Sequence, residues 1–400
     1  MMPAMDNATY LARYARSMMG VYGRPKVVLT RGEGCYVWDA DDKRYLDLLA
    51  GIAVNALGHG HPAVVDAVAR QAASLIHVSN FFATPPQIEL AERLLAVAGA
   101  PEGSSVFFAN SGTEAVEAAI KVSRRTGRTA LVAAEGSFHG RTTGALALTH
   151  KHSYREPFAP LIPSVTHVPF NDEGALRAAV TRDVAALFLE PLQGEAGVVA
   201  AEPAYLRLAR ELTTATGTLL ILDEVQTGVG RTGTWFAFQQ AGIVPDAITV
   251  AKGLAGGVPI GALVTFGAAI SGLLTGGQHG STFGGNPLAA AAGLAVLDTI
   301  EKDGLLAHAT SVGNHLADSV AALGHPLIAG VRGEGLLRAI ELSADVSAVV
   351  ADRALTAGFI INAPTPDVLR IVPPLVVTTA QIDTFVAALP TLLDGLGPAS

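Results

Sequence analysis

Cysteine is almost absent from this sequence of 400 residues, which contains only Cys35. A single thiol excludes an intrachain disulfide and a cysteine-rich metal site, and it is typical of a protein in the reducing cytoplasm. We expect Cys35 to fill space in the core. The pair His59 and His61 in GHGHP has no third ligand nearby, so we expect a turn there and no metal.

Charged residues are also scarce, at 16% of the chain with a formal net charge of -8. The basic residues are scattered, which argues against a nucleic-acid partner. No charged residue lies between Lys252 and Asp298, but glycine and proline interrupt this tract too often for a membrane span. The N-terminus lacks an apolar stretch of signal-peptide length, so a cytoplasmic protein without a membrane partner is expected.

Apolar and small residues are abundant instead: half of the chain is hydrophobic and 43 residues are glycine. This composition fits a large α/β enzyme and excludes a disordered chain. A length of 400 residues exceeds the size at which one core keeps growing, so more than one structural unit is expected.

The pattern along the chain predicts three segments. Residues 1–50 contain a short amphipathic helix and a plausible hairpin around an Asp-Asp-Lys turn. Residues 51–295 alternate short apolar runs with helical stretches, which is typical of a mostly parallel sheet covered by helices on both faces. Residues 296–400 predict a smaller α+β unit, and the pattern alone does not show whether the N-terminal hairpin packs with it.

Two polar residues follow apolar runs in the middle segment. Asp223 ends TLLILD, and Lys252 follows DAITVA. Open α/β sheets bind ligands at the carboxyl ends of their strands, where an acid can protonate a pyridine ring and a lysine can form a Schiff base. Such residues are more often a cap and a surface charge, but the apolar flanks of Lys252 favour a function.

Three further segments follow predicted strands. Ser111-Gly112-Thr113 opens a helical stretch that could bind a phosphate, although a capping box of Ser111 with Glu114 explains the same residues. In the second segment, Phe138 could stack on a flat ring, and Arg141 could hold a carboxylate; core packing and a surface ion pair are the alternatives. Glu195 lies in the third, a loop after VAALFLEPLQ, where a carboxylate is usually just exposed.

Together these segments resemble the class III aminotransferases of fold type I along almost the whole chain. The motifs LILDEVQTGVGRTG, ITVAKGLAGGVPIGA and HGSTFGGNPLAAAA occur in the family's order. The resemblance implies pyridoxal 5'-phosphate as cofactor, a large domain with a mostly parallel sheet, and a smaller α+β domain built from both terminal segments. Val116, where relatives often have Asn, and Ala255, which interrupts the usual triple glycine, depart from the pattern.

The family's site residues carry over onto matching positions. Lys252 would form the Schiff base and later move a proton, and Asp223 would pair with the pyridinium nitrogen. The remaining cofactor contacts would come from Gly112, Thr113, Phe138, Gln226 and Thr282. Substrate contacts would come from Arg141, Glu195, Ser281 and Arg370. Because the family supplies the Ser-Thr pair from a neighbouring subunit, the resemblance implies a homodimer with shared active sites.

The resemblance is strongest to the branch of the family that acts on N-acetylornithine, through FFANSGTEAVEAAIK, SFHGRTTGALALT and EPLQGEAGV. The implied reaction converts N-acetylornithine and 2-oxoglutarate to N-acetylglutamate 5-semialdehyde and glutamate, in arginine biosynthesis. Arg370 would bind the α-carboxylate of glutamate, Glu195 would mask this cation while the diamine reacts, and Arg141 would hold the remote carboxylate.

Several other functions stay open. Ile52 aligns with a tyrosine that contacts the free α-amino group of the substrate in ornithine aminotransferases. An apolar residue at this position suits an acylated nitrogen. N-succinylornithine, N-succinyl-diaminopimelate, free ornithine and 4-aminobutyrate remain alternative donors. A catalytically inactive binding protein of the same fold is the non-enzyme alternative. A nicotinamide-dependent dehydrogenase is the rival enzyme class, but the sequence lacks its glycine-rich fingerprint.

Overall fold

The computed structural model describes residues 6–396 and contains a large sheet of seven strands in the order β4-β12-β11-β10-β7-β5-β6. These strands are β4 (Ser105–Ala109), β5 (Ala130–Ala134), β6 (Val165–Val168), β7 (Val184–Leu189), β10 (Leu219–Asp223), β11 (Ala247–Val250) and β12 (Gly261–Thr265). Only β12 pairs antiparallel with its neighbours, β4 and β11. The prediction of a mostly parallel sheet is therefore confirmed.

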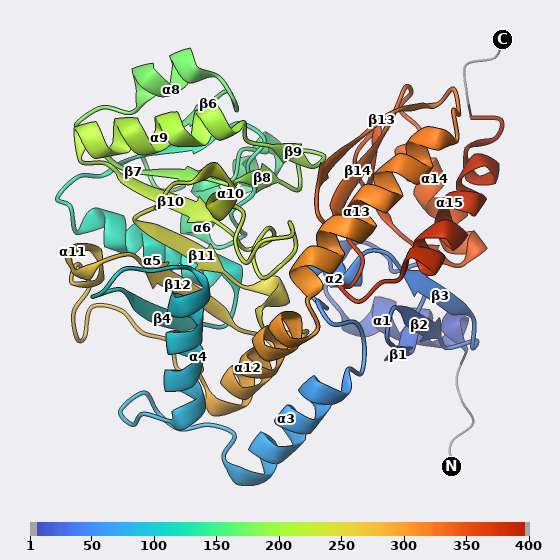
Figure 1. The fold of residues 1–400 in the computed structure, drawn as a ribbon, viewed down its shortest axis with the longest axis horizontal. Helices are drawn as coiled ribbons and strands as arrows, with labels where there is room; N and C mark the ends of the chain where they lie inside the picture. Colours follow the sequence, from blue (N-terminus) through green and yellow to red (C-terminus); the bar gives the residue numbers. More distant parts are fainter. Residues whose placement is uncertain (1–5, 397–400) are drawn as a thin grey trace.

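Alternating side chains of the central strands enter two different cores. In β10, Leu220 and Leu222 pack in one core with residues of the helix Pro203–Thr216. Leu219 and Ile221 pack in a second core with residues of the helix Gly112–Arg124. Because successive side chains of a strand point to opposite faces, both faces of the sheet are covered by helices, as Figure 1 shows.

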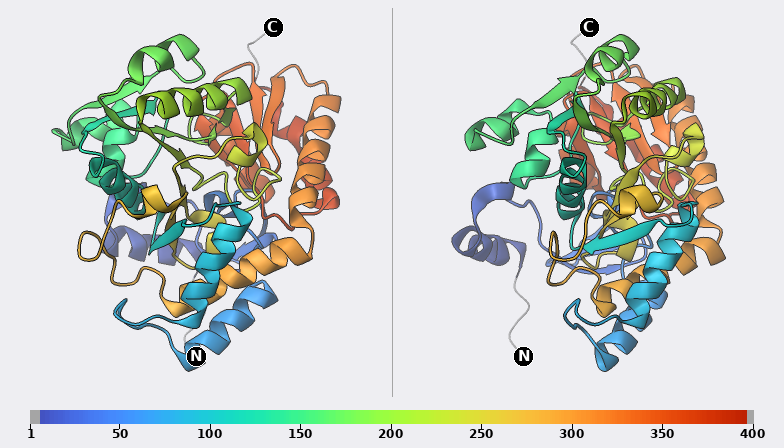
Figure 2. Two further views of the ribbon diagram at one scale, coloured as in Figure 1. Left: turned by 60° about the vertical axis from the view of Figure 1, so that its left-hand side comes forward. Right: turned by 90° about the vertical axis from the view of Figure 1, so that its left-hand side faces the viewer.

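The helices begin where proline and polar caps predict. Proline occupies the first turn of α3, α4, α9 and α12. The α-helices of the middle part are α3 (Pro62–Ser74), α4 (Pro85–Val97), α5 (Gly112–Arg124), α6 (Thr143–Leu148), α7 (His152–Arg155), α8 (Glu173–Ala179), α9 (Pro203–Thr216), α10 (Phe238–Ala241), α11 (Ala268–Ser271) and α12 (Pro287–Lys302). Figure 2 shows α3 and α4 at the lower end of the molecule in both views.

The terminal segments form two smaller sheets beside the large one. The first has the order β1-β2-β3-β15 and the second β13-β14-β17-β16. Their strands are β1 (Leu29–Glu33), β2 (Tyr36–Asp39), β3 (Arg44–Asp47), β13 (Ile328–Glu334), β14 (Leu337–Leu342), β15 (Phe359–Ile360), β16 (Asn362–Thr365) and β17 (Val368–Ile371). The accompanying helices are α1 (Asn7–Ser17), α13 (Leu305–Ala322), α14 (Ser347–Ala357) and α15 (Thr379–Leu393).

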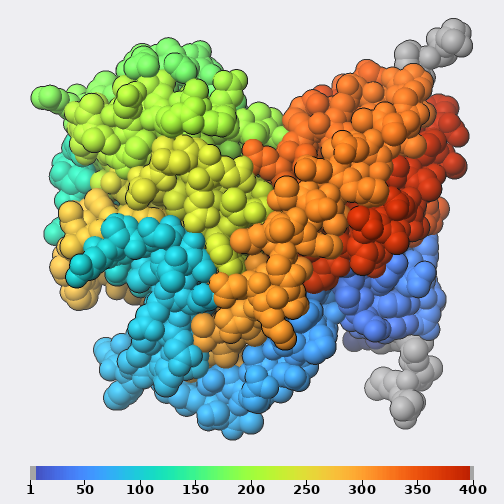
Figure 3. Space-filling view, viewed as in Figure 1, coloured from blue at the N-terminus to red at the C-terminus, as the bar shows by residue number. Residues whose placement is uncertain are grey.

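The N-terminal hairpin packs with the C-terminal part of the chain. The predicted hairpin is present as β2 and β3, and β15 pairs with β3 in parallel, with Phe359 opposite Leu46. Figure 1 shows the N-terminal strands next to the C-terminal helices, and in Figure 3 the N-terminal (blue) and C-terminal (red) parts of the surface touch. The division of domains at residues 50 and 295 remains a prediction, and α12 continues through residue 295.

A tight turn, α2 (Ala50–Ala53), connects the N-terminal hairpin to the large domain. All four of its residues have positive φ angles, including Ile52 at 64°. Asp47 accepts hydrogen bonds from two backbone amides at the start of this turn, and its second oxygen lies 2.8 Å from His59 Nε2. The GHGHP segment is thus a turn, as predicted, and His61 caps α3.

Cys35 is buried, as predicted. Within residues 6–396, no helix is long and apolar enough to cross a membrane, and no cluster of potential metal ligands is found. The apolar runs and helical stretches predicted from the sequence did not include β6, β13 or α14.

Candidate active site

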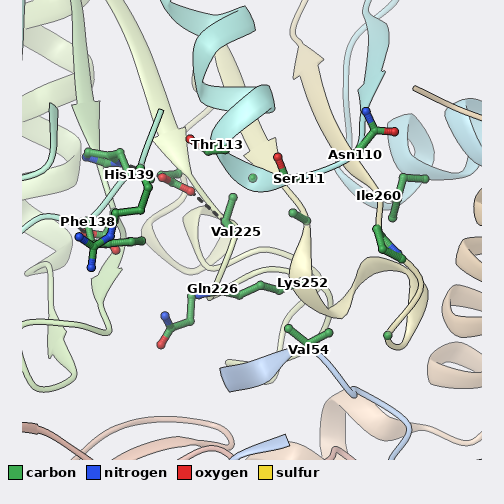
Figure 4. Close-up of a pocket in the computed structure, with 18 of the residues that line it drawn as sticks. Val54, Asn110, Ser111, Thr113, Phe138, His139, Val225, Gln226, Lys252 and Ile260 are labelled. Atoms are coloured by element: carbon green, nitrogen blue, oxygen red, sulfur yellow. Dashed lines mark hydrogen bonds and ion pairs between the residues drawn. The ribbon is translucent and has the colours of Figure 1, made fainter. Parts of the chain in front are cut away.

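A cavity of about 420 Å³ opens at the carboxyl ends of β10 and β11, and Asp223 and Lys252 both line it. Asp223 ends β10, and Lys252 follows β11, its parallel neighbour. Parallel strands bring their carboxyl ends to one edge of the sheet, which explains why the two residues meet. Figure 4 shows Phe138 and His139 on one side of this cavity, and Asn110 and Ile260 on the other.

Asp223 is buried in a network of hydrogen bonds. His139 Nδ1 lies 2.7 Å from its Oδ2, while Thr249 Oγ1 donates to its Oδ1 at 2.9 Å. Burial disfavours the charged imidazole, but the hydrogen bond to Asp223 and its negative charge outweigh this effect and raise the pKa of His139. The aspartate is thereby fixed in position. The sequence pattern assigned no role to His139 in SFHGRTTGALALT or to Thr249 in ITVAKGLAGGVPIGA.

Lys252 combines a strained backbone with a perturbed amine. Its φ angle is 39°, in the left-handed region that residues with a side chain seldom adopt. Burial, followed by the positive charge of Arg370, lowers the pKa of Lys252 to about 8. Such an amine is partly neutral near neutral pH and can act as a nucleophile or a base.

Glu190 is a second acid in the cavity that the sequence analysis missed. It lies directly after β7, is buried, and accepts a hydrogen bond from the Phe138 amide at 3.0 Å. Burial raises the pKa of Glu190 to about 8. Its place at the end of an apolar strand was the available signal, the same one that identified Asp223.

The start of α5 forms one wall of the cavity, through Ser111, Gly112 and Thr113. The first amides of a helix lack acceptors within the helix, so they can bind an anion. Ser111 Oγ accepts the Glu114 amide at 3.3 Å, but the Glu114 carboxylate accepts the amide of Asn110. The expected capping box is thus only half formed, because the glutamate reaches one residue further back.

Gly112 has no room for a side chain at this wall. A Cβ atom there would lie 2.8 Å from Val225 Cγ1. Val225 lines the same cavity between Asp223 and Gln226. Glycine therefore lets the start of α5 approach the segment that follows β10.

Glu195 and Arg370 are paired, as the sequence analysis predicted for one state of the site. Arg370 Nη1 donates to Glu195 Oε1 at 2.6 Å and to Gln226 Oε1 at 3.2 Å, while its Nε donates to Asn362 Oδ1 at 3.0 Å. Burial opposes the charged form of Glu195, but Arg370 outweighs this and lowers the pKa of Glu195. Arg370 is fully buried, and its Nη2 has no hydrogen-bond partner within the described chain.

Arg141 lines the cavity from its exposed rim. Its guanidinium carbon lies 3.5 Å from the centre of the Tyr154 ring and 5.6 Å from that of Phe138. In residues 6–396, no carboxylate is within ion-pair distance of Arg141. The alternative of a surface ion pair is therefore wrong, and the guanidinium can receive an anion from solution.

Ser281 and Thr282 do not line this cavity. They line a separate hollow beside Phe107 and His279, and Ser281 Oγ accepts a hydrogen bond from Asn110 Nδ2 at 2.8 Å. Asn110 lines both hollows. One chain thus brings seven predicted site residues to the main cavity: Gly112, Thr113, Phe138, Arg141, Asp223, Gln226 and Lys252. Glu195 and Arg370 do not line it but adjoin it through Gln226, and the Ser-Thr pair lies in the separate hollow.

This arrangement can hold a flat heteroaromatic ligand that carries a phosphate. The start of α5 can accept the phosphate, Phe138 can cover a ring, and Asp223 can pair with a protonated ring nitrogen. A partly neutral lysine in the same cavity can bind a carbonyl carbon covalently. The buried, unpaired Arg370 Nη2 can donate to a carboxylate beside it.

Comparison with known proteins identifies the family. Residues 19–393 match the family described as aminotransferase class-III. An acetylornithine aminotransferase of Streptomyces coelicolor is 55% identical, with 98% of this chain and 96% of that protein covered. One of Mycobacterium tuberculosis is 54% identical, with 97% and 96% covered.

Solved structures of aminotransferases share the fold of this chain. The ornithine aminotransferase of Toxoplasma gondii superposes with a TM-score of 0.92 at 31% identity and covers 97% of this chain and 95% of its own. An acetylornithine aminotransferase of Elizabethkingia anophelis gives 0.85 at 33% identity, with 97% and 99% covered. This chain belongs to the class-III aminotransferases.

Proposed function

We propose that this chain is a pyridoxal-phosphate-dependent acetylornithine aminotransferase, which converts N-acetylornithine and 2-oxoglutarate to N-acetylglutamate 5-semialdehyde and glutamate. The observation that carries the proposal is the meeting of Lys252 and Asp223 in one cavity, with the Glu195–Arg370 pair beside it. The relatives at 55% and 54% identity support N-acetylornithine as the donor.

The residues of the cavity fit the cofactor. Pyridoxal phosphate, when bound, supplies an electron sink for the carbon from which a proton is removed. Lys252 would hold the cofactor covalently, and its amine would take up and return the substrate proton. Asp223, fixed by His139 and Thr249, holds a proton at the ring nitrogen. Gly112 and Thr113 would bind the phosphate, Phe138 would cover the ring, and Gln226 would contact its hydroxyl group.

The domain organisation follows from the same assignment. Residues 51–295 form the large cofactor-binding domain, and residues 1–50 and 296–400 form the small domain together. The pairing of β3 with β15 supports this division.

The donor is tested by a panel of amines with 2-oxoglutarate as acceptor. We expect kcat/KM for N-acetylornithine to exceed that for ornithine by at least about tenfold, the ratio that 1.4 kcal/mol produces. The reason is that Ile52, which aligns with the tyrosine that contacts the free α-amino group in ornithine aminotransferases, is apolar and offers a free α-ammonium group no hydrogen-bond partner. A higher kcat/KM for ornithine, 4-aminobutyrate or a succinylated donor would reassign the substrate.

The Glu195–Arg370 pair explains how one cavity accepts two different substrates. Glutamate places a carboxylate beside its reacting carbon and needs a cation, whereas the diamine places only methylene groups there. An unmasked buried guanidinium is costly, so Glu195 neutralises Arg370 while the diamine reacts and moves aside for glutamate. Arg141 holds the remote carboxylate in both half-reactions.

Substitution of Glu195 should therefore affect the two half-reactions unequally. Losing one partner of a buried pair costs about 2–5 kcal/mol. The Glu195 side chain is 36% exposed, so solvent screening lowers the expected effect to about 1–2 kcal/mol, or roughly five- to thirtyfold. In single-turnover measurements, Glu195→Ala should slow reaction with N-acetylornithine by this factor and preserve or speed reaction with glutamate.

Two further variants complete this test. Arg370→Ala should mainly damage the reaction with glutamate, because the cation for the α-carboxylate is lost. Glu202→Ala removes an exposed carboxylate at the start of α9 and should change neither half-reaction. Equal slowing of both half-reactions by Glu195→Ala would rule out the exchange.

The location of Ser281 and Thr282 outside the cavity supports a homodimer in which each subunit completes the other's site. Mixing inactive Lys252→Ala subunits with inactive Thr282→Ala subunits should restore about a quarter of wild-type activity, since half of the randomly formed dimers contain one intact site. No recovery in verified heterodimers would contradict shared sites.

A further inference from the structure

The hairpin that carries Glu195 reaches away from the large sheet. Its strands, β8 (Leu192–Gln193) and β9 (Val199–Ala200), pair antiparallel and are connected by residues 194–198. The Gly197 amide donates to the Gly194 carbonyl at 3.3 Å, so Glu195 lies within a turn at the hairpin tip. Figure 1 shows this hairpin beside β13, a strand of the small sheet.

Arg332 of β13 binds this tip directly. Its Nε donates to the carbonyl oxygens of Gly197 at 3.0 Å and Val198 at 3.1 Å, and its Nη2 donates to Gly197 at 2.7 Å. Its Nη1 pairs with Glu341 of β14. A planar guanidinium that donates to two successive carbonyls fixes the direction of both peptide groups.

The conformation that Arg332 holds is strained. Val198 is a β-branched, fully buried residue with φ 62°, next to Gly197 with φ 95°. Residues in this region persist only where their surroundings impose the conformation. The small sheet imposes it closely, since a Cβ atom on Gly333 would lie 2.8 Å from Val198 Cγ1.

The opposite end of the turn is also confined. A Cβ atom on Gly194 would lie 2.0 Å from Gln226 Oε1. The turn is therefore confined by the close approach of Gln226 at its beginning and held by the hydrogen bonds of Arg332 at its end. Between these two points, the Glu195 side chain is about one-third exposed and reaches Arg370.

We propose that Arg332 is a positioning residue for Glu195. By holding the carbonyls of Gly197 and Val198, Arg332 confines the exchange at Arg370 to the side chain of Glu195, while the backbone of the hairpin stays in place. The masking carboxylate then returns to the same position after each half-reaction. This inference rests on the proposed exchange of Glu195 and is independent of the roles of Lys252 and Asp223.

The first test compares the two half-reactions in Arg332→Gln. A loosened tip lets Glu195 leave Arg370, so the ratio of the N-acetylornithine rate to the glutamate rate should fall by about threefold or more. The matched control is Arg338→Gln, because Arg338 also donates to backbone carbonyls of the β13–β14 hairpin but does not bind the tip. Arg338→Gln should leave the ratio unchanged, even where it lowers the melting temperature.

The second test needs no turnover. Amide hydrogen exchange across residues 194–200 should be faster in Arg332→Gln than in the wild type, and unchanged there in Arg338→Gln. In a Glu195→Ala background, Arg332→Gln should not change the ratio further, because its effect passes through Glu195. If Arg332→Gln does not fold, Arg332→Lys, which keeps the charge but loses the planar pair of donors, enters the same measurements.

The outcomes separate the two proposals. If Glu195→Ala changes the ratio and Arg332→Gln does not, the role of Arg332 is refuted and the exchange survives. An equal fall of the ratio in Arg338→Gln also refutes the role of Arg332. So does a fall of the ratio that Arg332→Gln still causes in the Glu195→Ala background. If Glu195→Ala leaves the ratio unchanged, the exchange itself fails, whatever the hydrogen exchange shows.

Discussion

Lys252→Ala is expected to abolish transamination, with a loss of at least about 10⁴-fold in kcat. General base catalysis alone contributes up to about this factor, and the covalent attachment of the cofactor is lost as well. The burial that lowers the pKa of Lys252 to about 8 keeps part of this amine neutral, and none of the charged groups nearby can replace it. Steady-state turnover with N-acetylornithine and 2-oxoglutarate measures the effect.

Two controls show that the loss concerns the amine and not the fold. Lys252→Arg keeps a cation but has no primary amine, so it should be equally inactive. Pyridoxal phosphate should still bind non-covalently to Lys252→Ala, because Gly112, Thr113 and Phe138 are unchanged. Substantial activity in pure Lys252→Ala protein would remove Lys252 from its proposed role.

Asp223→Ala is expected to lower kcat by about 10²- to 10³-fold, the range found when one preorganised electrostatic group is removed. Without the carboxylate, a pyridine nitrogen does not stay protonated, and the cofactor withdraws electrons less well. His139 also loses the partner that raises its pKa. Stopped-flow measurement of each half-reaction should show both slowed, unlike the unequal effect of Glu195→Ala.

Asp246→Asn provides a matched control for this substitution. Asp246 precedes β11 and accepts the Leu220 amide of β10 at 2.7 Å while pairing with Arg210, so it supports the same two strands. It does not line the cavity. Asp246→Asn should lower stability and leave kcat nearly unchanged, and a rate near the wild type in Asp223→Ala would refute the role of Asp223.

Sequence patterns predicted the large sheet because its strands are short, continuous apolar runs. The runs in β7, β10 and β11 are buried along their whole length, and Asp223 and Thr249 are the only polar residues in them. The missed strand β6, with the sequence VTHV, is partly exposed and mixes polar with apolar residues. The antiparallel direction of β12 was not predictable either, since a buried run has the same composition in both directions.

Site residues that directly follow a strand could be predicted from the sequence. Residues that act through contacts with a distant element could not. Asp223 and Lys252 were found by their positions after apolar runs, and the resemblance added Arg370. His139 gave no separate signal, because its role depends on Asp223, which faces it from another strand. Glu190 follows an apolar strand as Asp223 does, but that position alone did not identify it as a site residue. Arg332 lies in an ordinary strand, and only the fold brings it to the Glu195 hairpin.

The parallel pairing of β3 with β15 has a consequence for biosynthesis. The sheet of the N-terminal hairpin is incomplete until β15, which lies roughly 300 residues later in the chain, has been synthesised. At about 5–20 residues per second, a ribosome needs roughly 15–60 s to produce that partner. During this interval the edge of β3 is unpaired and open to wrong partners, so the nascent chain is expected to need protection by chaperones until its last quarter has emerged.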